Sequence, residues 1–274
     1  MSDSFFRSFV PEDEPGLPEA DTGVAHIARV YDYWLGGKDH FAADREVGDR
    51  VLEIHPETVQ SVRANRGFLA RSVRYLAYKE GIRQFLDIGT GLPSANNTHE
   101  VAQATARQAR VVYVDNDPIV LAHARALLTS GPDGATAFLD ADVRNIGQVL
   151  PGAAQLLDFS EPVAVMLVAL LHMVPDEDDP HGIVDRYMAA VPPGSFLVLS
   201  HLASDVEAKT IAEMARRMNQ SMTQQVTPRG KAEVTRFFDG LDLLEPGVVL
   251  THEWRPDADD GPPGVLWSGV ARKA

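Results

Sequence analysis

The sequence predicts an α/β protein: a doubly wound, mostly parallel sheet with a helical lid at its N-terminal end. From residue 84, short β-rich runs alternate with helical stretches, and this alternation is typical of parallel strands joined by right-handed crossovers. The last two β-rich runs, 243–250 and 265–271, are joined by a polar loop with no room for a helix. We therefore expect those two strands to be antiparallel neighbours.

The N-terminal part of the chain has a helical pattern. Residues 1–23 are rich in Pro, Glu and Asp, and we expect them to form a disordered acidic tail. Apolar residues then recur at helical spacing in three stretches, 24–35, 42–53 and 57–78. We expect residues 24–81 to form a helical lid that precedes the main domain.

The main domain, residues 82–274, supplies the sheet. Before the antiparallel pair, its candidate strands are 84–88, 110–115, 136–140, 163–171 and 196–200. Helical stretches separate or follow these strands near 95–108, 117–129, 144–157, 181–191 and 231–239. An insertion at about 203–228 lies between the fifth strand and the last helix. We interpret it as a second lid that covers the substrate.

The composition limits the classes of partner. The 274 residues include 39 Asp and Glu against 25 Lys and Arg, a formal net charge of −14. Such an acidic surface repels phosphate backbones and anionic lipids, so we expect neither a nucleic acid nor a membrane as partner. Cysteine is absent, which excludes disulfides and thiolate zinc sites. The sequence shows no signal-peptide pattern and no apolar stretch long enough to span a bilayer, so we expect a cytoplasmic location.

The strongest chemical signal lies where the first strand ends. The run Asp87-Ile88-Gly89-Thr90-Gly91 places an acid and a glycine turn between an apolar strand and a helix, where a backbone can approach a ligand closely. The second strand ends in Asp115, and the third is followed by Asp142. The carboxyl ends of parallel strands share one edge of a sheet, so we expect a nucleoside ligand there. The alternative is that these acids only cap helices.

The residues after the glycine turn indicate which kind of nucleoside binds. A dinucleotide site has the pattern G-x-G-x-x-G, whereas Ser94, preceded by Pro93, stands in the place of the third glycine here. Acids are unfavourable beside a pyrophosphate, but they suit a ligand with hydroxyls, an amino group and a cationic centre. S-adenosylmethionine (SAM) fits that description.

Five segments make the sequence resemble a known family: VYDYWLGGKDHFAADR (30–45), VRANRGFL (62–69), QFLDIGTGLP (84–93), VVYVDNDPIVLAHARALL (111–128) and LLHMVPDEDDP (170–180). They resemble class I SAM-dependent methyltransferases, and more narrowly the actinobacterial S-adenosyl methyltransferase family formerly catalogued as a domain of unknown function. The resemblance covers the chain from about residue 24 to the C-terminus. It implies a Rossmann-like sheet of seven strands and SAM as the cofactor.

The resemblance also implies roles for the residues at the strand ends. Those that would line the methionine and ribose side of the cofactor are Asp87, Gly89, Thr90 and Gly91. Those that would hold the ribose and the adenine are Asp115, Asn116, Asp142 and Val143. The end of the fourth strand, at Ala169, would pass beneath the transferred methyl group. Pro93 departs from the general pattern of class I methyltransferases, which has a third glycine there.

The lid offers further candidates for binding. Tyr31 or Tyr33, together with Arg63 or Arg66, would bind the cofactor carboxylate or the substrate if the lid closes over the pocket. We also consider Tyr31 a candidate catalytic residue. The alternative for each of these residues is ordinary packing and a surface salt bridge.

The segment after the fourth strand suggests a general base. His172 is the first candidate, because an imidazole titrates near neutral pH. A capping or packing role is the alternative, and His201 is a second candidate. The acidic run 176–179 precedes Pro180, so we interpret it as a helix cap with solvated charge and expect no metal site.

These features together predict a SAM-dependent methyltransferase that acts on an oxygen, nitrogen or carbon atom of a small-molecule substrate. The acidic charge and the insertion at 203–228 favour a small substrate over a nucleic acid. One alternative is a non-catalytic SAM-binding regulatory module. The other is an NAD(P)-dependent oxidoreductase, which the Pro93-Ser94 turn disfavours.

Overall fold

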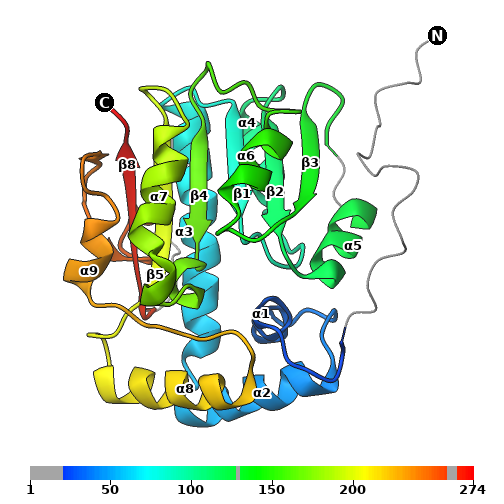
Figure 1. The fold of residues 1–274 in the computed structure, drawn as a ribbon, viewed down its shortest axis with the longest axis vertical. Coiled ribbons are helices and arrows are strands. Elements are labelled where there is room, and N and C mark those ends of the chain that lie inside the picture. The colour runs from blue at the N-terminus through cyan, green and yellow to red at the C-terminus, as the bar shows by residue number, and fades with distance from the viewer. Residues whose placement is uncertain (1–20, 128–129, 258–263) are drawn as a thin grey trace.

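A mixed sheet lies between two layers of helices in this protein (Figure 1), whose computed structural model describes residues 21–127, 130–257 and 264–274. The strands are β1 Gln84–Ile88, β2 Arg110–Asp115, β3 Ala135–Asp140, β4 Ala164–Val168, β5 Phe196–Leu202, β6 Asp242–Leu243, β7 Val249–Leu250 and β8 Leu266–Arg272. They run in the order β3-β2-β1-β4-β5-β8-β6, and β7 also pairs with β8. Strands β1 to β5 pair in parallel, which confirms the predicted sheet. Apart from residues 21–23, the predicted tail lies outside the described residues.

The C-terminal strands differ from the prediction in number. The run predicted as one strand, 243–250, forms β6 and β7, and both are antiparallel to β8 as expected. Pro246 lacks an N–H for a ladder, and Gly247 turns the chain with a φ of 87°. The described residues therefore hold eight strands instead of seven.

Strand β4 is also shorter than the predicted 163–171. It ends at Val168, because Ala169 takes a left-handed conformation with a φ of 55°. A short 3₁₀ turn, η1 (Leu171–Met173), follows at once. The residues after β4 therefore bend across the carboxyl edge of the sheet instead of extending it.

Apolar helices cover both faces of the sheet. The helices are α1 Ile27–Leu35, α2 Ala42–Ile54, α3 Thr58–Tyr78, α4 Thr98–Thr105, α5 Pro118–Leu127, α6 Ile146–Ala153, α7 Pro180–Ala189, α8 Ala208–Ser221 and α9 Lys231–Arg236. Successive strand residues point to opposite faces, so Phe85 packs with α3, α4 and α5, whereas Leu86 packs with α6, α7 and α9. This is the doubly wound arrangement that the strand–helix alternation predicts.

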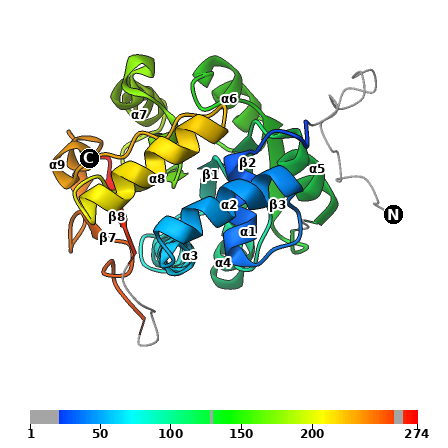
Figure 2. The same cartoon turned by 90° about the horizontal axis from the view of Figure 1, so that it is seen from below.

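A third apolar cluster joins α1, α2 and α8 beyond one end of the sheet (Figures 1 and 2). Val30 and Trp34 of α1 pack in it with Met214 and Met218 of α8. The two segments predicted as lids, 24–81 and 203–228, therefore pack against each other. Helix α3 contributes its first turns to this cluster and its later turns to the sheet, so the lid boundary at residue 81 stays a prediction.

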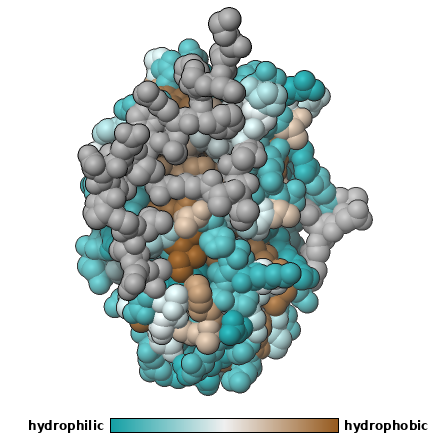
Figure 3. Space-filling model, turned by 90° about the vertical axis from the view of Figure 1, so that its right-hand side faces the viewer, coloured by the Kyte–Doolittle hydropathy of each residue, from teal (hydrophilic) through white to brown (hydrophobic). Residues whose placement is uncertain are grey.

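The surface is predominantly hydrophilic on the side shown in Figure 3. Among large apolar side chains of the described residues, only Val24 and Tyr78 are exposed. Within the same residues, every helix is too short or too polar to cross a membrane.

Candidate functional site

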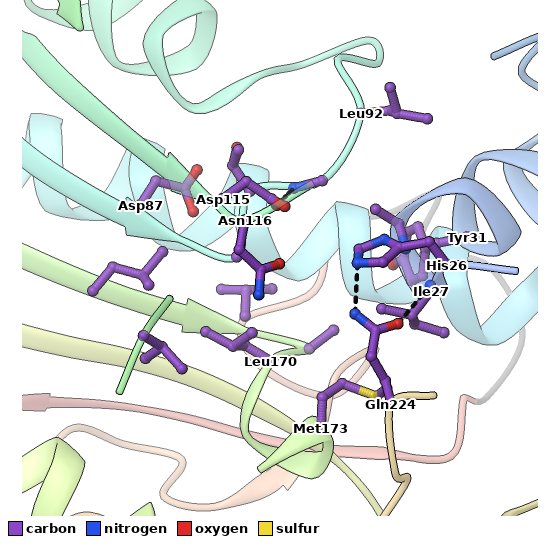
Figure 4. Close-up of a pocket in the computed structure, with 18 of the residues that line it drawn as sticks. His26, Ile27, Tyr31, Asp87, Leu92, Asp115, Asn116, Leu170, Met173 and Gln224 are labelled. Atoms are coloured by element: carbon purple, nitrogen blue, oxygen red, sulfur yellow. Dashed lines mark hydrogen bonds between the residues drawn. The ribbon is translucent and has the colours of Figure 1, made fainter. Parts of the chain in front are cut away.

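A cavity lies between the carboxyl edge of the sheet and the helices of the lid (Figure 4). Its volume is about 1190 Å³, including the space at its open mouth. This is enough for a ligand of nucleoside size. The ends of β1, β2 and β4 form one wall, and α1 and α3 form the other. Most of the predicted site residues line it: Tyr31, Asp87, Gly89, Thr90, Gly91, Asp115, Asn116, Asp142, Val143 and Ala169.

The glycine turn after β1 shapes the floor of the cavity. Gly89 and Gly91 have φ angles of 71° and 66°, which favour glycine. A Cβ on Gly89 would also stand 2.6 Å from a methyl carbon of Leu170. The Gly89 N–H donates to the carbonyl of Val114 at 2.8 Å, so the turn is fastened to β2. Its backbone is thereby exposed to the cavity in a fixed conformation.

Asp115 ends β2 and lies at the centre of the cavity wall. Its carboxylate accepts the N–H of Gly91 at 2.9 Å and the N–H of Asp117 at 3.0 Å. Burial raises the pKa of Asp115, while those two hydrogen bonds oppose the rise. Its carboxylate therefore lines the cavity with each oxygen held by one backbone N–H.

Asp87 ends β1 on the same wall and is 4% exposed. The Thr98 hydroxyl at the start of α4 donates to its carboxylate at 2.6 Å. Burial raises the pKa of Asp87 to about 6, and the Arg66 guanidinium opposes this only in part. The negative charge of ionised Asp87 is therefore only partly balanced by the groups around it.

Asp142 behaves differently, because a cation pairs with it directly. Arg144 donates to both carboxylate oxygens at 2.7 Å, and the Asn116 amide donates at 3.1 Å. The Arg144 hydrogen bonds lower the pKa of Asp142 despite its partial burial. Arg144 also contacts Asp178 at 2.8 Å and lines the cavity. Sequence reasoning missed it, although it stands only two residues after Asp142.

A chain of hydrogen bonds joins the lid to the end of β4. The Tyr31 hydroxyl donates to the Val62 carbonyl at 3.1 Å and accepts from the Asn65 amide at 3.0 Å. Asn65 in turn accepts from the Ser200 hydroxyl at 2.6 Å, and that hydroxyl accepts the Ala169 N–H at 2.9 Å. Burial raises the pKa of Tyr31. Tyr31 thus holds the lid against the strand end as a neutral phenol.

The other lid candidates fall on different sides of the cavity wall. Arg66 lines the cavity and donates to the carbonyls of Ala95 and Asn96, each at 3.1 Å. Its buried Nε has no hydrogen-bond partner within the described part of the chain. Arg63 is exposed on α3, and Tyr33 points its hydroxyl at Asp49 on the surface. Neither Arg63 nor Tyr33 lines the cavity.

The two histidines proposed as bases lie behind the cavity wall. His172 is buried, and its ring centroid is 5.4 Å from that of His201. Burial, together with the nearby Arg229, lowers the pKa of His172 to about 4. The Nε2 atom of His201 contacts Arg229 at 2.9 Å. Neither imidazole lines the cavity, so the packing alternative describes their surroundings.

Two cavity residues carried no signal in the sequence. His26 stands just before α1, and Gln224 lies in the segment after α8 (Figure 4). Their side chains meet at 2.6 Å, although 198 positions separate them in the chain. His26 also contacts Asp117 at 2.9 Å. Only the folded chain brings these groups together, so no spacing or motif in the sequence indicates them.

The acidic run at 176–179 forms the helix cap that the sequence predicts. The Asp179 carboxylate accepts the N–H of Gly182 at the start of α7, while Asp176 pairs with Arg229 and Asp178 with Arg144. Within the ranges that the structure describes, no group of three or more His, Asp or Glu side chains is arranged to hold a metal ion.

Comparison with known proteins places these features in a family. The family model described as S-adenosyl methyltransferase matches residues 14–274. A DUF574 family protein of Streptomyces avermitilis is 43% identical, with a TM-score of 0.90 over 93% of this chain and 99% of that one. A putative methyltransferase of Thermobifida fusca is 42% identical, with a TM-score of 0.84 over 94% of this chain and 97% of that one.

A more distant structure is similar in fold alone. Human N-acetylserotonin methyltransferase, crystallised with SAM, is 14% identical and has a TM-score of 0.51 over 92% of this chain and 63% of that one. No protein with curated annotation matches the chain.

Proposed function

The chain belongs to the S-adenosyl methyltransferase family, and from that premise we propose that it methylates a small-molecule acceptor inside the cavity beneath the lid. Its class I fold and its family make it a SAM-dependent methyltransferase, with SAM as the cofactor. The observation that carries the proposal for the acceptor is the closed geometry. The lid helix α1 and Gln224 cover the carboxyl edge of the sheet, so the reacting groups lie inside a cavity.

The residues of the cavity fit SAM chemically. The ribose hydroxyls of SAM need acceptors, and Asp115 provides a carboxylate at the end of β2. The ammonium and the sulfonium are cations, and Asp87 offers an uncompensated carboxyl group. The carboxylate needs a cation, and the Nε of Arg66 is without a hydrogen-bond partner in the described chain. We assign the carboxylate to Arg66 instead of Arg63, and the lid contact to Tyr31 instead of Tyr33.

The residues that would bind the rest of the cofactor lie on the same wall of the cavity. Asn116, Asp142 and Val143 lie together after β2 and β3, where the adenine would bind. The backbone of Gly89 and Gly91 faces the methionine portion. SAM supplies a methyl group activated by a positively charged sulfur. The protein's own task is then to hold the acceptor in line with that group and to keep water out.

A small acceptor agrees with the surface of the molecule. The net charge of −14 repels the phosphates of nucleic acids. On the lid side, the cavity wall combines apolar side chains, among them Ile27, Leu35 and Leu69, with polar ones. A compact molecule with apolar and polar parts fits such a wall better than a polymer does.

Calorimetric titration with SAM, S-adenosylhomocysteine (SAH) and NADH tests the cofactor site. We expect micromolar binding of SAM and SAH and none of NADH. Binding of NADH alone would contradict the proposal. A screen for SAH release with phenols, alcohols and amines, with short RNA as the contrast, then tests the acceptor. Release with RNA alone would refute a small-molecule acceptor, and no release with any acceptor would favour a non-catalytic SAM-binding module.

A further inference from the structure

The two walls of the cavity differ in their polar groups. The sheet wall carries the carboxylates already described, whereas the polar side chains of the lid wall are His26, Tyr31, Asp32, Asn65, Arg66 and Gln224. Figure 4 shows His26 and Gln224 on that lid wall, facing each other near Met173 and across from Asp115. Tyr31 lies beside them, but Val62 and Asn65 already engage its hydroxyl. His26 and Gln224 therefore form a polar pair that lines the cavity from the lid side.

The orientation of the Gln224 amide is fixed by the backbone. The Ile27 N–H donates to Gln224 Oε1 at 3.1 Å, so this oxygen must face Ile27. The amide nitrogen then faces His26 Nε2 at 2.6 Å. An amide nitrogen can only donate, so His26 Nε2 must present its lone pair.

The other ring nitrogen then carries the proton of the neutral imidazole. His26 Nδ1 lies 2.9 Å from Asp117 Oδ2. The Ala28 N–H donates to the same nitrogen at 3.3 Å, whereas Asp117 Oδ2 is buried without a hydrogen-bond partner in the described residues. Because Gln224 holds Nε2 as an acceptor, the proton of the neutral ring stands on Nδ1, on the side of the closer carboxylate.

Asp117 is built to stay ionised in this position. It is 3% exposed, and its other oxygen accepts the Ile119 N–H at 2.8 Å. Burial alone would raise the pKa of Asp117, but His26, the Ile119 N–H and Arg29 together lower it. Arg29 Nε is 3.4 Å away. Asp44 faces the same cluster and accepts the backbone N–H of His26 at 2.9 Å.

We propose that His26, oriented by Asp117, is the general base that takes the proton from an O–H or N–H group of the acceptor. This inference rests on the proposed function. The acceptor's lone pair forms the bond to the methyl carbon while the carbon–sulfur bond breaks toward sulfur. The acceptor's proton passes to His26 Nε2, and the imidazolium pairs with Asp117 until it releases the proton to water. Gln224 holds the lone pair in place until an acceptor replaces it.

Nitrogen NMR of the full chain with ¹⁵N-labelled histidine tests the first requirement, with SAH bound. We expect a neutral His26 with the proton on Nδ1, assigned by its loss in His26→Asn, which keeps a helix-capping side chain. In Asp117→Asn we expect a mixture of tautomers. An Nε2–H tautomer in the wild type would overturn the proposal, because no lone pair would face the cavity. Absent SAH binding would instead count against the proposed function.

Turnover with the fastest acceptor of the screen tests the second requirement. We expect His26→Asn to lower kcat by about 100-fold or more with unchanged SAH affinity, since general bases contribute roughly 10²–10⁴-fold. The matched control is His123→Gln, whose imidazole lies 3.5 Å from Asp39 outside the cavity. Equal losses in both variants, or a wild-type kcat in His26→Asn, would refute the role of His26.

Discussion

Asp87 and Asp115 at the carboxyl edge of the sheet are buried without a close cation, whereas Asp44 in the lid and Asp117 beside it are buried next to one. At the sheet edge, burial raises the pKa values of Asp87 and Asp115, because no cation pairs closely with either. Arg29 of the lid lies 3.6 Å from Asp44 and 3.4 Å from Asp117, which follows β2. Arg29 thus supplies a counter-charge for these two acids, whereas Asp87 and Asp115 leave excess negative charge at the cavity wall, and that charge suits a cationic ligand.

This difference separates residues kept for binding from residues kept for folding. A buried acid without a close cation destabilises the ligand-free protein. Such an acid is retained in evolution where a bound ligand compensates its charge. Asp44, a buried acid with two backbone N–H partners and Arg29 beside it, stabilises the fold instead. Replacing one acid of each kind should therefore change stability in opposite directions.

The largest expected effect is on stability at the sheet edge. Between pH 3.8 and about 6, the folded protein binds more protons at Asp87 than the unfolded chain does, so rising pH lowers stability through this window. Above that window Asp87 destabilises the fold by about 2–3 kcal/mol, at roughly 1.4 kcal/mol per pKa unit. Asp87→Asn should therefore raise the free energy of unfolding at pH 7 and leave it nearly unchanged below pH 4. Urea unfolding at both pH values measures this.

Asp44→Asn is the matched variant in the lid. Asp44 accepts the N–H groups of His26 and Phe41 at 2.9 and 2.8 Å, one on each oxygen. An asparagine can accept only one of them, so we expect a loss of about 1–3 kcal/mol. Stabilisation by Asp44→Asn, or destabilisation by Asp87→Asn at pH 7, would break the contrast between the two regions.

The next effect concerns affinity for the cofactor. Asp115→Ala should weaken SAM and SAH binding by about 1–3 kcal/mol, because the ribose hydroxyls would lose their acceptor. Calorimetric titration measures this directly. The Gly91 and Asp117 N–H groups also lose their partner, so the variant's unfolding must be measured in parallel. An unchanged affinity in a folded variant would remove Asp115 from the cofactor site.

The same contrast explains what the sequence could predict. Asp87 and Asp115 lie in the last two residues of the apolar strands β1 and β2, and the parallel pairing of these strands places their ends side by side. Such positions depend on local pattern and on sheet geometry, so sequence reasoning found them. It also predicted the antiparallel C-terminal pair, but it missed the break at Pro246 and the early end of β4 at Val168.

The lid residues depend on contacts that no local pattern encodes. Gln224 reaches Ile27 and His26 across almost the whole chain. Arg63 and Arg66 differ by less than one helical turn, yet only Arg66 faces the cavity. His172 was predicted as a general base because it follows a strand, but the turn η1 places its ring behind the cavity wall. The direction of a side chain within a helix or turn is fixed by tertiary packing, and the sequence does not state it.

Arg66 and its neighbour Arg63 allow a more specific test, with a smaller expected effect. Arg66→Ala should weaken SAH binding by about tenfold, near 1.4 kcal/mol, the lower end for a hydrogen bond to a charged group. Binding of 5′-methylthioadenosine should not change, because this ligand has no carboxylate. Arg63→Ala is the control, and it should leave both affinities as they are. Equal losses for both ligands would place Arg66 away from the carboxylate.

The smallest expected effect comes from Tyr31→Phe, which removes the hydroxyl that joins Asn65 to the Val62 carbonyl. One such hydrogen bond contributes about 0.5–1.5 kcal/mol, and the loss should appear in the free energy of unfolding. Because burial raises the pKa of Tyr31, the phenol stays neutral at pH 7 and cannot serve as a base. Turnover should therefore fall without any change in its pH dependence. Tyr33→Phe, on the surface, should change neither quantity. A pH profile altered by Tyr31→Phe would show that the lid takes part in proton transfer through this residue, and not only through His26.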